Sequence, residues 1–346
     1  MNISMKFMRI SLSLVTLLFY TGMGSSEAIS AGQLSASESS MLEQTEVLVS
    51  GRIGQAEVTP AGLSFDKGTT RVKLDNNTKT ISVTNRNGTI ELKQGSVKDI
   101  EVHTTVVVDN ATTKEEAKAV ANKAELRVNK GETLDIHAYS EAYGSNKYQY
   151  PSIHLTIMLP QTINSDLLVK TTNGNISLSK LTRVGKINLT STNGNITANG
   201  ISNDIILKTT NGNVEVSDAS KGARISVTNG NIQADRISGP LNMKATNGNL
   251  SSKKAVSSIE AATTTGNIRI ESEKIGGDWN VSTSTGKVYL AWPESAGVKV
   301  DGETTFGEIK TDFPLTIKDH TVTGKMGDGT FHIRAKSMAK LSLMKN

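Results

Sequence analysis

The chain has 346 residues, enough for a large core, but only 4% of them are aromatic, while Gly, Asn, Ser and Thr are abundant. This composition argues against a helical protein and favours many short strands joined by turns. The absence of cysteine excludes disulfides and a lipid anchor on cysteine, and a net charge of +5 is too mild to indicate a nucleic-acid-binding protein.

The N-terminus has the pattern of an export signal. Residues 1–28 combine a basic region, with Lys6 and Arg9, and an apolar run that is too short to span a membrane. We expect cleavage after Ala28, with an uncleaved anchor as the alternative. Residues 29–45 lack periodicity and are expected to form a flexible leader. The sequence therefore predicts export to the periplasm, the cell surface or the medium, with no membrane span after cleavage.

Residues 46–165 are predicted to be a β-rich segment, because Val, Ile and Leu recur at every second position. The exception is one helix near 113–124, where Thr112 or Thr113 can cap the start and a glutamate three residues on completes a capping box. After the helix, the pattern predicts a two-stranded ribbon and then the strand SIHLTIMLP.

From residue 166 the phrase TNGN returns with a period of 18 residues, stretched to 20 at either end, and Asn87-Gly88 is a divergent early copy. A fixed period of this length indicates a repeat architecture. The predicted corners of the repeats are Asn173, Gly174, Asn193, Gly194, Asn211, Gly212, Asn229, Gly230, Asn247, Gly248, Gly266 and Gly286.

Apolar residues stand seven and five positions before each repeat glycine, and two and four positions after it. This parity gives two strands per repeat. A meander of hairpins with type I′ turns would fit, but uniform columns favour in-register stacking. We therefore predict an all-β fold, a single-stranded parallel β-solenoid (β-helix) with about 18-residue coils. Regular coils would span 166–293, and irregular coils with a cap would span 294–346.

The asparagines around each glycine are interpreted as structural rather than ligand-binding. They can form amide ladders between coils, and they tolerate positive φ at a corner. Within 294–346, the stretches around Gly307 and Gly329 keep the glycine-to-apolar phrase, but the loops between them lengthen.

Motifs of known catalysts are absent, and the five histidines are scattered singly, so no cofactor and no metal site are predicted. One carboxylate pair could act on a polysaccharide: Glu215 and Asp235 would face outward on neighbouring coils, diagonally about 7–8 Å apart. A rank of outward threonines resembles an ice-binding face, but the companion column holds Lys170, Lys208 and Lys244, so β-propensity is the better explanation.

A tyrosine-rich segment lies between the ribbon and the strand SIHLTIMLP. It holds Tyr139, Tyr143, Tyr148 and Tyr150, which could form an exposed binding platform or pack across strands at the end of a sheet.

The NGNI, NGNV and NGNL coils, the strand SIHLTIMLP, the helix TTKEEAKAV and the stretch TTFGEIKTDFPL together resemble the bacterial "putative adhesin" β-strand-repeat family, a domain of unknown function. The resemblance covers about 46–343. It implies a β-solenoid without catalytic residues and a partner that is an envelope glycan, a surface polymer or a protein. The predicted function is thus exported, non-enzymatic binding or adhesion; the alternative is a polysaccharide lyase or hydrolase.

Overall fold

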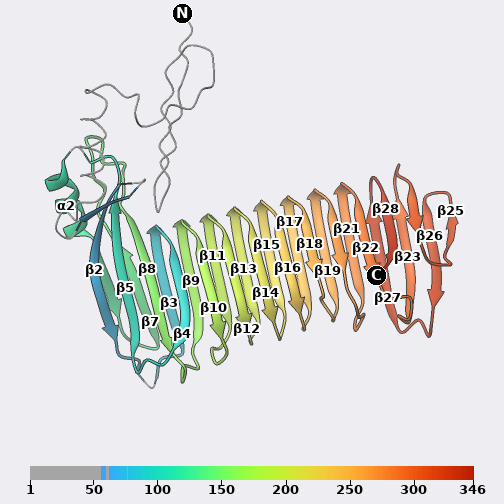
Figure 1. Ribbon diagram of the computed structural model, residues 1–346, viewed down its shortest axis with the longest axis horizontal. Coiled ribbons are helices and arrows are strands. Elements are labelled where there is room, and N and C mark those ends of the chain that lie inside the picture. Colours follow the sequence, from blue (N-terminus) through green and yellow to red (C-terminus); the bar gives the residue numbers. More distant parts are fainter. Residues whose placement is uncertain (1–55, 60–61, 76, 112) are drawn as a thin grey trace, which may run out of the picture. The chain divides into compact units, whose positions relative to one another are not determined.

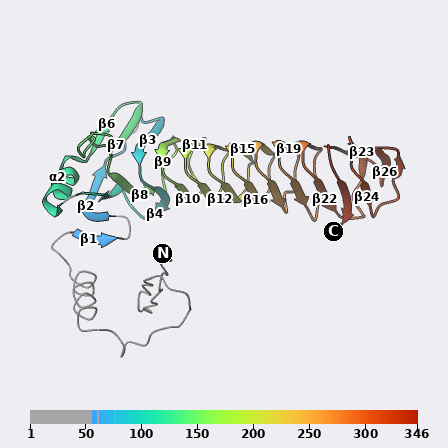
Figure 2. The ribbon, with the colours of Figure 1, turned by 90° about the horizontal axis from the view of Figure 1, so that it is seen from above.

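The repeat phrase builds a solenoid of two facing sheets, sheet A and sheet B, and each coil contributes one strand to each sheet (Figures 1 and 2). The structure is a computed structural model that describes residues 56–59, 62–75, 77–111 and 113–346. The predictions for 1–28 and 29–45 lie outside the described residues. No helix in the described ranges is long and apolar enough to cross a membrane.

Sheet A contains the strand that follows each corner. Its order is β1 (Ala56–Thr59), β2 (Gly62–Val72), β5 (Ile100–Val108), β8 (Ser152–Pro160), β4 (Ile90–Gly95), β10 (Ile176–Leu181), β12 (Ile196–Ile201), β14 (Val214–Ala219), β16 (Ile232–Ile237), β18 (Leu250–Lys253), β20 (Ile268–Glu271), β22 (Val288–Trp292), β28 (Leu341–Lys345) and β24 (Ile309–Thr311).

Sheet B contains the strand that precedes each corner. Its order is β25 (Thr316–Lys318), β26 (Thr321–Met326), β23 (Val298–Thr304), β27 (Phe331–Ser337), β21 (Trp279–Thr285), β19 (Ile259–Thr265), β17 (Leu241–Asn247), β15 (Ala223–Asn229), β13 (Ile205–Asn211), β11 (Ile187–Asn193), β9 (Asp166–Asn173), β3 (Thr80–Asn87), β7 (Thr133–Tyr139) and β6 (Glu125–Asn129).

The predicted in-register stacking is confirmed along the regular coils. Every strand from β9 to β22 pairs in parallel with its counterpart one coil away, for example Leu189 with Leu207 and Ile196 with Val214. All four predicted apolar columns are buried. Each buried Ile, Val or Leu contributes roughly 1.5–3 kcal/mol, and the columns of both sheets belong to one continuous core.

The corner glycines bring successive coils into close backbone contact. A Cβ on Gly230 would lie 2.0 Å from the carbonyl oxygen of Gly212, and the backbone of Gly230 has φ +146°. The same contact recurs from Gly174 to Gly286, at 1.8–2.2 Å from the preceding corner glycine. The idea that asparagines supply positive φ at this corner is wrong: positive φ falls on the glycine, because only glycine also leaves room for the stacked carbonyl.

A row of inward-facing hydroxyls supports the same corner. Thr209 Oγ1 donates to the carbonyl of Gly194 at 3.0 Å, and Ser191, Thr263, Thr283 and Ser337 do the same for the corner of the preceding coil. Val227 and Ala245 occupy the equivalent positions and carry no hydroxyl for the carbonyls of Gly212 and Gly230. These two coils therefore lack one interaction that their neighbours have.

Two outward amide ladders run along the corner. In the ladder before the glycine, each Nδ2 donates to the Oδ1 of the preceding coil at 2.8–2.9 Å, and its members are Asn87, Asn173, Asn193, Asn211, Asn229 and Asn247. In the ladder after the glycine, each side-chain oxygen instead accepts the backbone N–H of the next coil, as Asn195 Oδ1 does from Asn213 at 2.8 Å. The side chains thus satisfy one another and the turn backbone.

A second corner ends strands β10, β12, β14, β16 and β18 of sheet A, and the repeat phrase does not indicate it. One residue in each of these five coils has a left-handed backbone there, with φ of 55° at Lys180, Asp218 and Lys254, 52° at Arg236 and 66° at Gly200. Only one of these five positions is a glycine, so no sequence column marks the turn. The corner is set by the buried residue that follows it, such as Leu181 or Ile237.

At the N-terminal end the coils are stacked out of chain order. Strands β3 and β4 pair with β9 and β10 on one side, and with β7 and β8 on the other. Asn87 lies beside Asn173, which confirms that Asn87-Gly88 is an early copy of the repeat. Between β4 and the array the chain forms β5, helix α2 (Lys114–Lys123) and the ribbon β6–β7. Thr113 caps α2 by accepting the N–H of Glu116 at 3.0 Å.

The C-terminal coil is also inserted out of order. Strands β27 and β28 lie between β21–β22 and β23–β24. Gly307 is a corner, because a Cβ there would meet the backbone of Ala339. Gly329 is not a corner, because it lies four residues before Ile333, which pairs with Trp279, and Trp279 stands seven positions before the corner glycine Gly286.

We predict that Gly230→Ala lowers the free energy of unfolding by at least about 3 kcal/mol, because the new methyl group overlaps a backbone carbonyl at a strained φ. Chemical unfolding monitored by circular dichroism measures the loss. The control is Gly68→Ala, where φ is +76° but no heavy atom lies within 4 Å of the added carbon, so only about 1–2 kcal/mol is expected. Equal losses in the two variants would contradict the stacked-carbonyl explanation.

We also predict that Val227→Thr raises stability by about 1 kcal/mol, because the new hydroxyl can donate to the carbonyl of Gly212, as Thr209 donates to Gly194. Thr209→Val should lower stability by a similar amount, because it removes the bond to Gly194. Thermal unfolding of the two variants and of the double variant tests this. A Val227→Thr protein less stable than the parent would show that the buried hydroxyl finds no acceptor.

Replacement of Asn211, Asn229 and Asn247 by Ala should lower the free energy of unfolding by about 1–3 kcal/mol in total, because three exposed hydrogen bonds between side-chain amides of neighbouring coils are lost. The matched control is Thr210→Ser, Thr228→Ser and Thr246→Ser, in the adjacent outward row of the same coils. Thermal unfolding measures the difference. If the alanine variant keeps its stability but loses ligand binding, the asparagines are a recognition element rather than a structural ladder.

Candidate binding surface

The outer face of sheet B presents three parallel rows of side chains across β9–β21. One row, two positions before the corner glycines, is made of hydroxyls. Four positions before the glycines, lysine alternates with small side chains over the first five coils. The rows are Thr172, Thr192, Thr210, Thr228, Thr246, Thr264 and Ser284; Lys170, Thr190, Lys208, Ser226, Lys244, Ala262 and Ser282; and Leu168, Asn188, Ile206, Arg224, Asn242, Glu260 and Asn280.

This face carries an excess of positive charge. Its bases are Lys170, Lys208, Lys244 and Arg224, and Glu260 is the one acid of the three rows on β9–β21. Lys244 forms an ion pair with Glu260 at 2.8 Å. Within the described residues, neither Lys170 nor Lys208 forms an ion pair. Both are exposed, so their ammonium groups are available to an anionic partner.

The outer face of sheet A is balanced by comparison. Strands β10–β22 carry four bases and four acids, which are Lys180, Arg236, Lys253 and Arg269 and Glu215, Asp218, Asp235 and Glu271. Arg269 also stacks on the ring of Tyr289, with 4.0 Å from its Cζ to the ring centroid, and contacts Glu271. The two faces of one solenoid therefore differ in charge.

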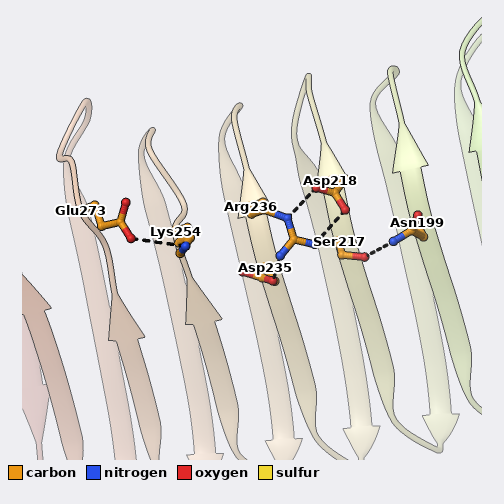
Figure 3. A network of polar contacts seen from close by, with 7 residues as sticks. All are labelled: Asn199, Ser217, Asp218, Asp235, Arg236, Lys254 and Glu273. Carbon is orange, nitrogen blue, oxygen red and sulfur yellow. Dashed lines mark hydrogen bonds and ion pairs between the residues drawn. The ribbon is translucent and has the colours of Figure 1, made fainter.

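The carboxylates Glu215 and Asp235 are diagonal neighbours, because Glu215 pairs with Gln233 and Asp235 with Ser217. Figure 3 shows that Asp235 belongs to a polar network at the second corner. Arg236 contacts Asp235 and also donates to both carboxylate oxygens of Asp218, from Nε at 2.6 Å and from Nη2 at 2.8 Å. Its guanidinium holds the pKa of Asp218 below the usual range.

The rest of this network links other coils at the same corner (Figure 3). Asn199 Nδ2 donates to Ser217 Oγ at 2.6 Å, and Lys254 pairs with Glu273 at 3.4 Å. These contacts connect outward side chains around left-handed residues. Because the side chain of Asp235 is held by Arg236, this network is better suited to stabilising the stacking of the coils than to proton transfer in catalysis.

The four tyrosines do not form a single exposed platform. The Tyr143 side chain is buried, and its hydroxyl donates to the carbonyl of Asp109 at 2.6 Å; burial raises the pKa of this hydroxyl. Tyr148 is 85% exposed. Tyr139 lies on β7 in sheet B, and Tyr150 lies in the segment just before β8. Tyr143 thus packs against the end of the sheet, as the alternative prediction stated for the group.

Two arginines accompany the half-buried tyrosines, and sequence patterns did not single them out. Arg127 on β6 lies over the ring of Tyr139, 3.4 Å from the ring centroid, and Arg86 on β3 lies over Tyr150 at 3.7 Å. Such cation–π contacts orient the guanidinium groups. We call Arg86, Arg127, Tyr139 and Tyr150 the arginine–tyrosine cluster. β7 and β3 continue sheet B beyond β9, so the cluster extends the cationic face.

A groove of about 290 Å³ lies at the opposite end of sheet B, over β21, β27, β23 and β26. Lys336 in its wall pairs with Glu303 at 2.5 Å, and Asp301 contacts His332. Arg334 also lines it. Bases and acids alternate here, so the groove has no strong preference for one sign of charge. Among the described residues, no group of three or more His, Asp or Glu side chains is placed to hold a metal ion.

Some solved structures resemble the chain. A "putative cell adhesion protein" from Clostridium sporogenes is 10% identical, with a TM-score of 0.28 and coverage of 81% of this chain and 100% of that one. A "putative adhesin" from Bacteroides fragilis is 16% identical, with a TM-score of 0.33 and coverage of 64% and 95%. One from Parabacteroides merdae is 11% identical, with a TM-score of 0.28 and coverage of 81% and 95%. No curated protein matches significantly.

The family comparison is more specific. A model described as Toastrack DUF4097 matches residues 77–339, more than half of the chain, and the matched range includes every regular coil of the solenoid. The match confirms the resemblance to an uncharacterised adhesin-like family that the repeats indicate. The chain belongs to the Toastrack DUF4097 family.

Proposed function

We propose that the protein is an exported, non-enzymatic binding protein of the cell envelope that attaches to an envelope glycan, a surface polymer or a protein. The observation that carries this proposal is the outer face of sheet B, where hydroxyl side chains repeat on every strand of β9–β21 and lysines on every second strand from β9 to β17. A regular polar face can contact an extended ligand at many weak points.

The alternative is an enzyme that acts on a polysaccharide. Catalytic carboxylates of glycosidases normally flank the scissile bond in a concave site, with both groups free to act on the substrate. Glu215 is exposed on the open face of sheet A, and Asp235 is engaged by Arg236. This arrangement favours attachment over cleavage, and the diagonal pair is the feature of the sequence that keeps the enzyme hypothesis testable.

The arginine–tyrosine cluster is proposed as a second contact region on the same sheet. Tyrosine rings stack on sugars or on partner side chains, and arginines pair with anions. Tyr148, which is exposed, would approach the ligand from the adjoining segment. Tyr143 would support the cluster from inside the fold. The proposal of export rests on residues 1–28, so fractionation of cells and protease treatment of intact cells should find the protein outside the cytoplasm.

Incubation of the purified full chain with isolated envelope fragments tests the function. We expect the protein to sediment with the fragments and to release neither new reducing ends nor unsaturated sugars. Glu215→Gln with Asp235→Asn should leave sedimentation unchanged. Release of sugar products that this double variant abolishes would establish the enzyme instead. Failure to sediment, together with no retention on envelope proteins, would contradict the binding function.

A further inference from the structure

The lysines on the outer face of sheet B form a row with a defined spacing. Lys170 on β9, Lys208 on β13 and Lys244 on β17 occupy the same register position, with Thr190 and Ser226 on the strands between them. Neighbouring strands lie about 4.8 Å apart, so successive lysines are about 9.6 Å apart and the row spans about 19 Å.

We propose that this row binds a linear anionic glycan with one carboxylate per disaccharide, which lies across the strands of sheet B. The inference rests on the proposed function and names its ligand class. Lys170 and Lys208 would each meet one carboxylate, and Lys244 would meet a third by exchanging its ion pair with Glu260. The sugar between two carboxylates would lie over Thr190 or Ser226. The ligand would run along the stacking direction of the coils, because lysines recur at a regular interval only in that direction.

The neighbouring rows supply groups that suit sugar hydroxyls. Exposed threonines, Thr172 to Thr246, flank the lysines on the corner side, whereas on the other side Asn188 and Asn242 are half-buried and the Asn242 amide donates to Glu260. Threonine hydroxyls can both donate and accept hydrogen bonds, as sugar hydroxyls do. Arg224 on β15, the strand between those of Lys208 and Lys244, adds a fourth positive charge beside these two lysines.

The difference between the two sheets places this ligand on sheet B. Strands β9–β21 of sheet B hold four bases and two acids, Glu260 and Asp166, whereas strands β10–β22 of sheet A hold four bases and four acids. Hydroxyls and amides occur on both faces, so charge is the property that distinguishes them. A polyanion that approaches the solenoid is therefore attracted to the outer face of sheet B.

A nucleic acid fits the row less well. It carries one charge per strand about every 3.4 Å in a duplex, far more than one cation per 9.6 Å could neutralise. Single strands are usually held by stacking on aromatic rings. Within the three described rows of β9–β21 on sheet B, no side chain is aromatic.

A protein partner also fits less well, because protein interfaces rely on buried aromatic and apolar anchors. On these rows Leu168 and Ile206 are the large apolar residues, and they lie on strands separated by β11. Isolated apolar side chains of this kind are normal on any surface. The hydroxyl, amide and lysine content instead matches a hydrated, charged glycan.

Each exposed lysine–carboxylate pair contributes at most about 1 kcal/mol, so a single pair would not hold the ligand. Three pairs on one rigid face act together, and the affinity should grow as the glycan becomes long enough to reach the next lysine. The contribution is electrostatic and should weaken as salt is added. Length dependence and salt dependence are therefore the properties to measure.

Titration calorimetry of the full chain with hyaluronan oligosaccharides tests the inference, because hyaluronan alternates a glucuronate with a neutral sugar. We expect the affinity to rise from disaccharide to tetrasaccharide to hexasaccharide, which present one, two and three carboxylates. It should fall at high salt, and neutral dextran should not bind. Affinity that does not depend on length, or tighter binding of single-stranded DNA, would overturn the proposal.

The variant Lys170→Gln, Lys208→Gln and Lys244→Gln should lose about tenfold or more in affinity for the hexasaccharide. The matched control, Lys93→Gln, Lys253→Gln and Lys287→Gln, removes the same charge from exposed lysines on the outer face of sheet A, and should lose about twofold at most. Unchanged thermal unfolding shows that both variants fold. Equal losses in the two variants would overturn the assignment to sheet B.

Sedimentation with envelope fragments separates this inference from the proposed function. If the parent protein sediments and the Lys170, Lys208 and Lys244 variant sediments equally well, the function stands and the lysine row is not the site. If the variant alone stays in solution, the row is the site. If the parent itself fails to sediment and is not retained by envelope proteins, the proposed function is wrong.

Discussion

The contact on which the whole solenoid depends is the stacking of one corner glycine on the carbonyl of the corner before it. From Gly174 to Gly286, a Cβ would lie 1.8–2.2 Å from that oxygen, so any side chain at these corners would push adjacent coils apart. Because the contact repeats in each coil, it aligns the strands on either side residue by residue. A shift of one residue would turn every apolar side chain outward.

Features that repeat in register from coil to coil could be predicted from the sequence, and features outside this register could not. The apolar columns, the parallel pairing and the early copy at Asn87 follow from the spacing of the repeats, and the structure confirms them. The second corner could not be predicted, because its left-handed residues include Lys180, Asp218 and Arg236, and no residue type marks it. Insertion of β27 and β28 between earlier coils was also hidden, because it depends on which strands meet across about 50 residues.

The candidate surface was only partly visible in the sequence for the same reason. The alternation of lysine with small residues can be read from one column, but its meaning depends on the opposite face, where Glu215, Asp235 and Glu271 balance the bases. The tyrosines were found from their spacing in the chain, whereas Arg86 and Arg127 reach them from strands that are distant in sequence. The arginine–tyrosine pairs thus depend on contacts between strands that are distant in sequence. Tyr143 is likewise held in the interior by the hydrogen bond from its hydroxyl to Asp109.

The inner rows of side chains stabilise the solenoid, whereas the outer rows are free to contact a ligand. Glycine stacking, inward hydroxyls and buried Ile, Val and Leu stabilise each coil, and none of them faces the outer rows. The side chains of Lys170 and Lys208 are therefore little constrained by the fold, Lys244 is paired with Glu260, and the spacing of all three is set by the strands beneath them. Individually weak lysine contacts can add up on this surface because the stacked corners hold the side chains at a fixed interval. The repeat that builds the core therefore also sets the spacing of charges that a bound ligand would have to match.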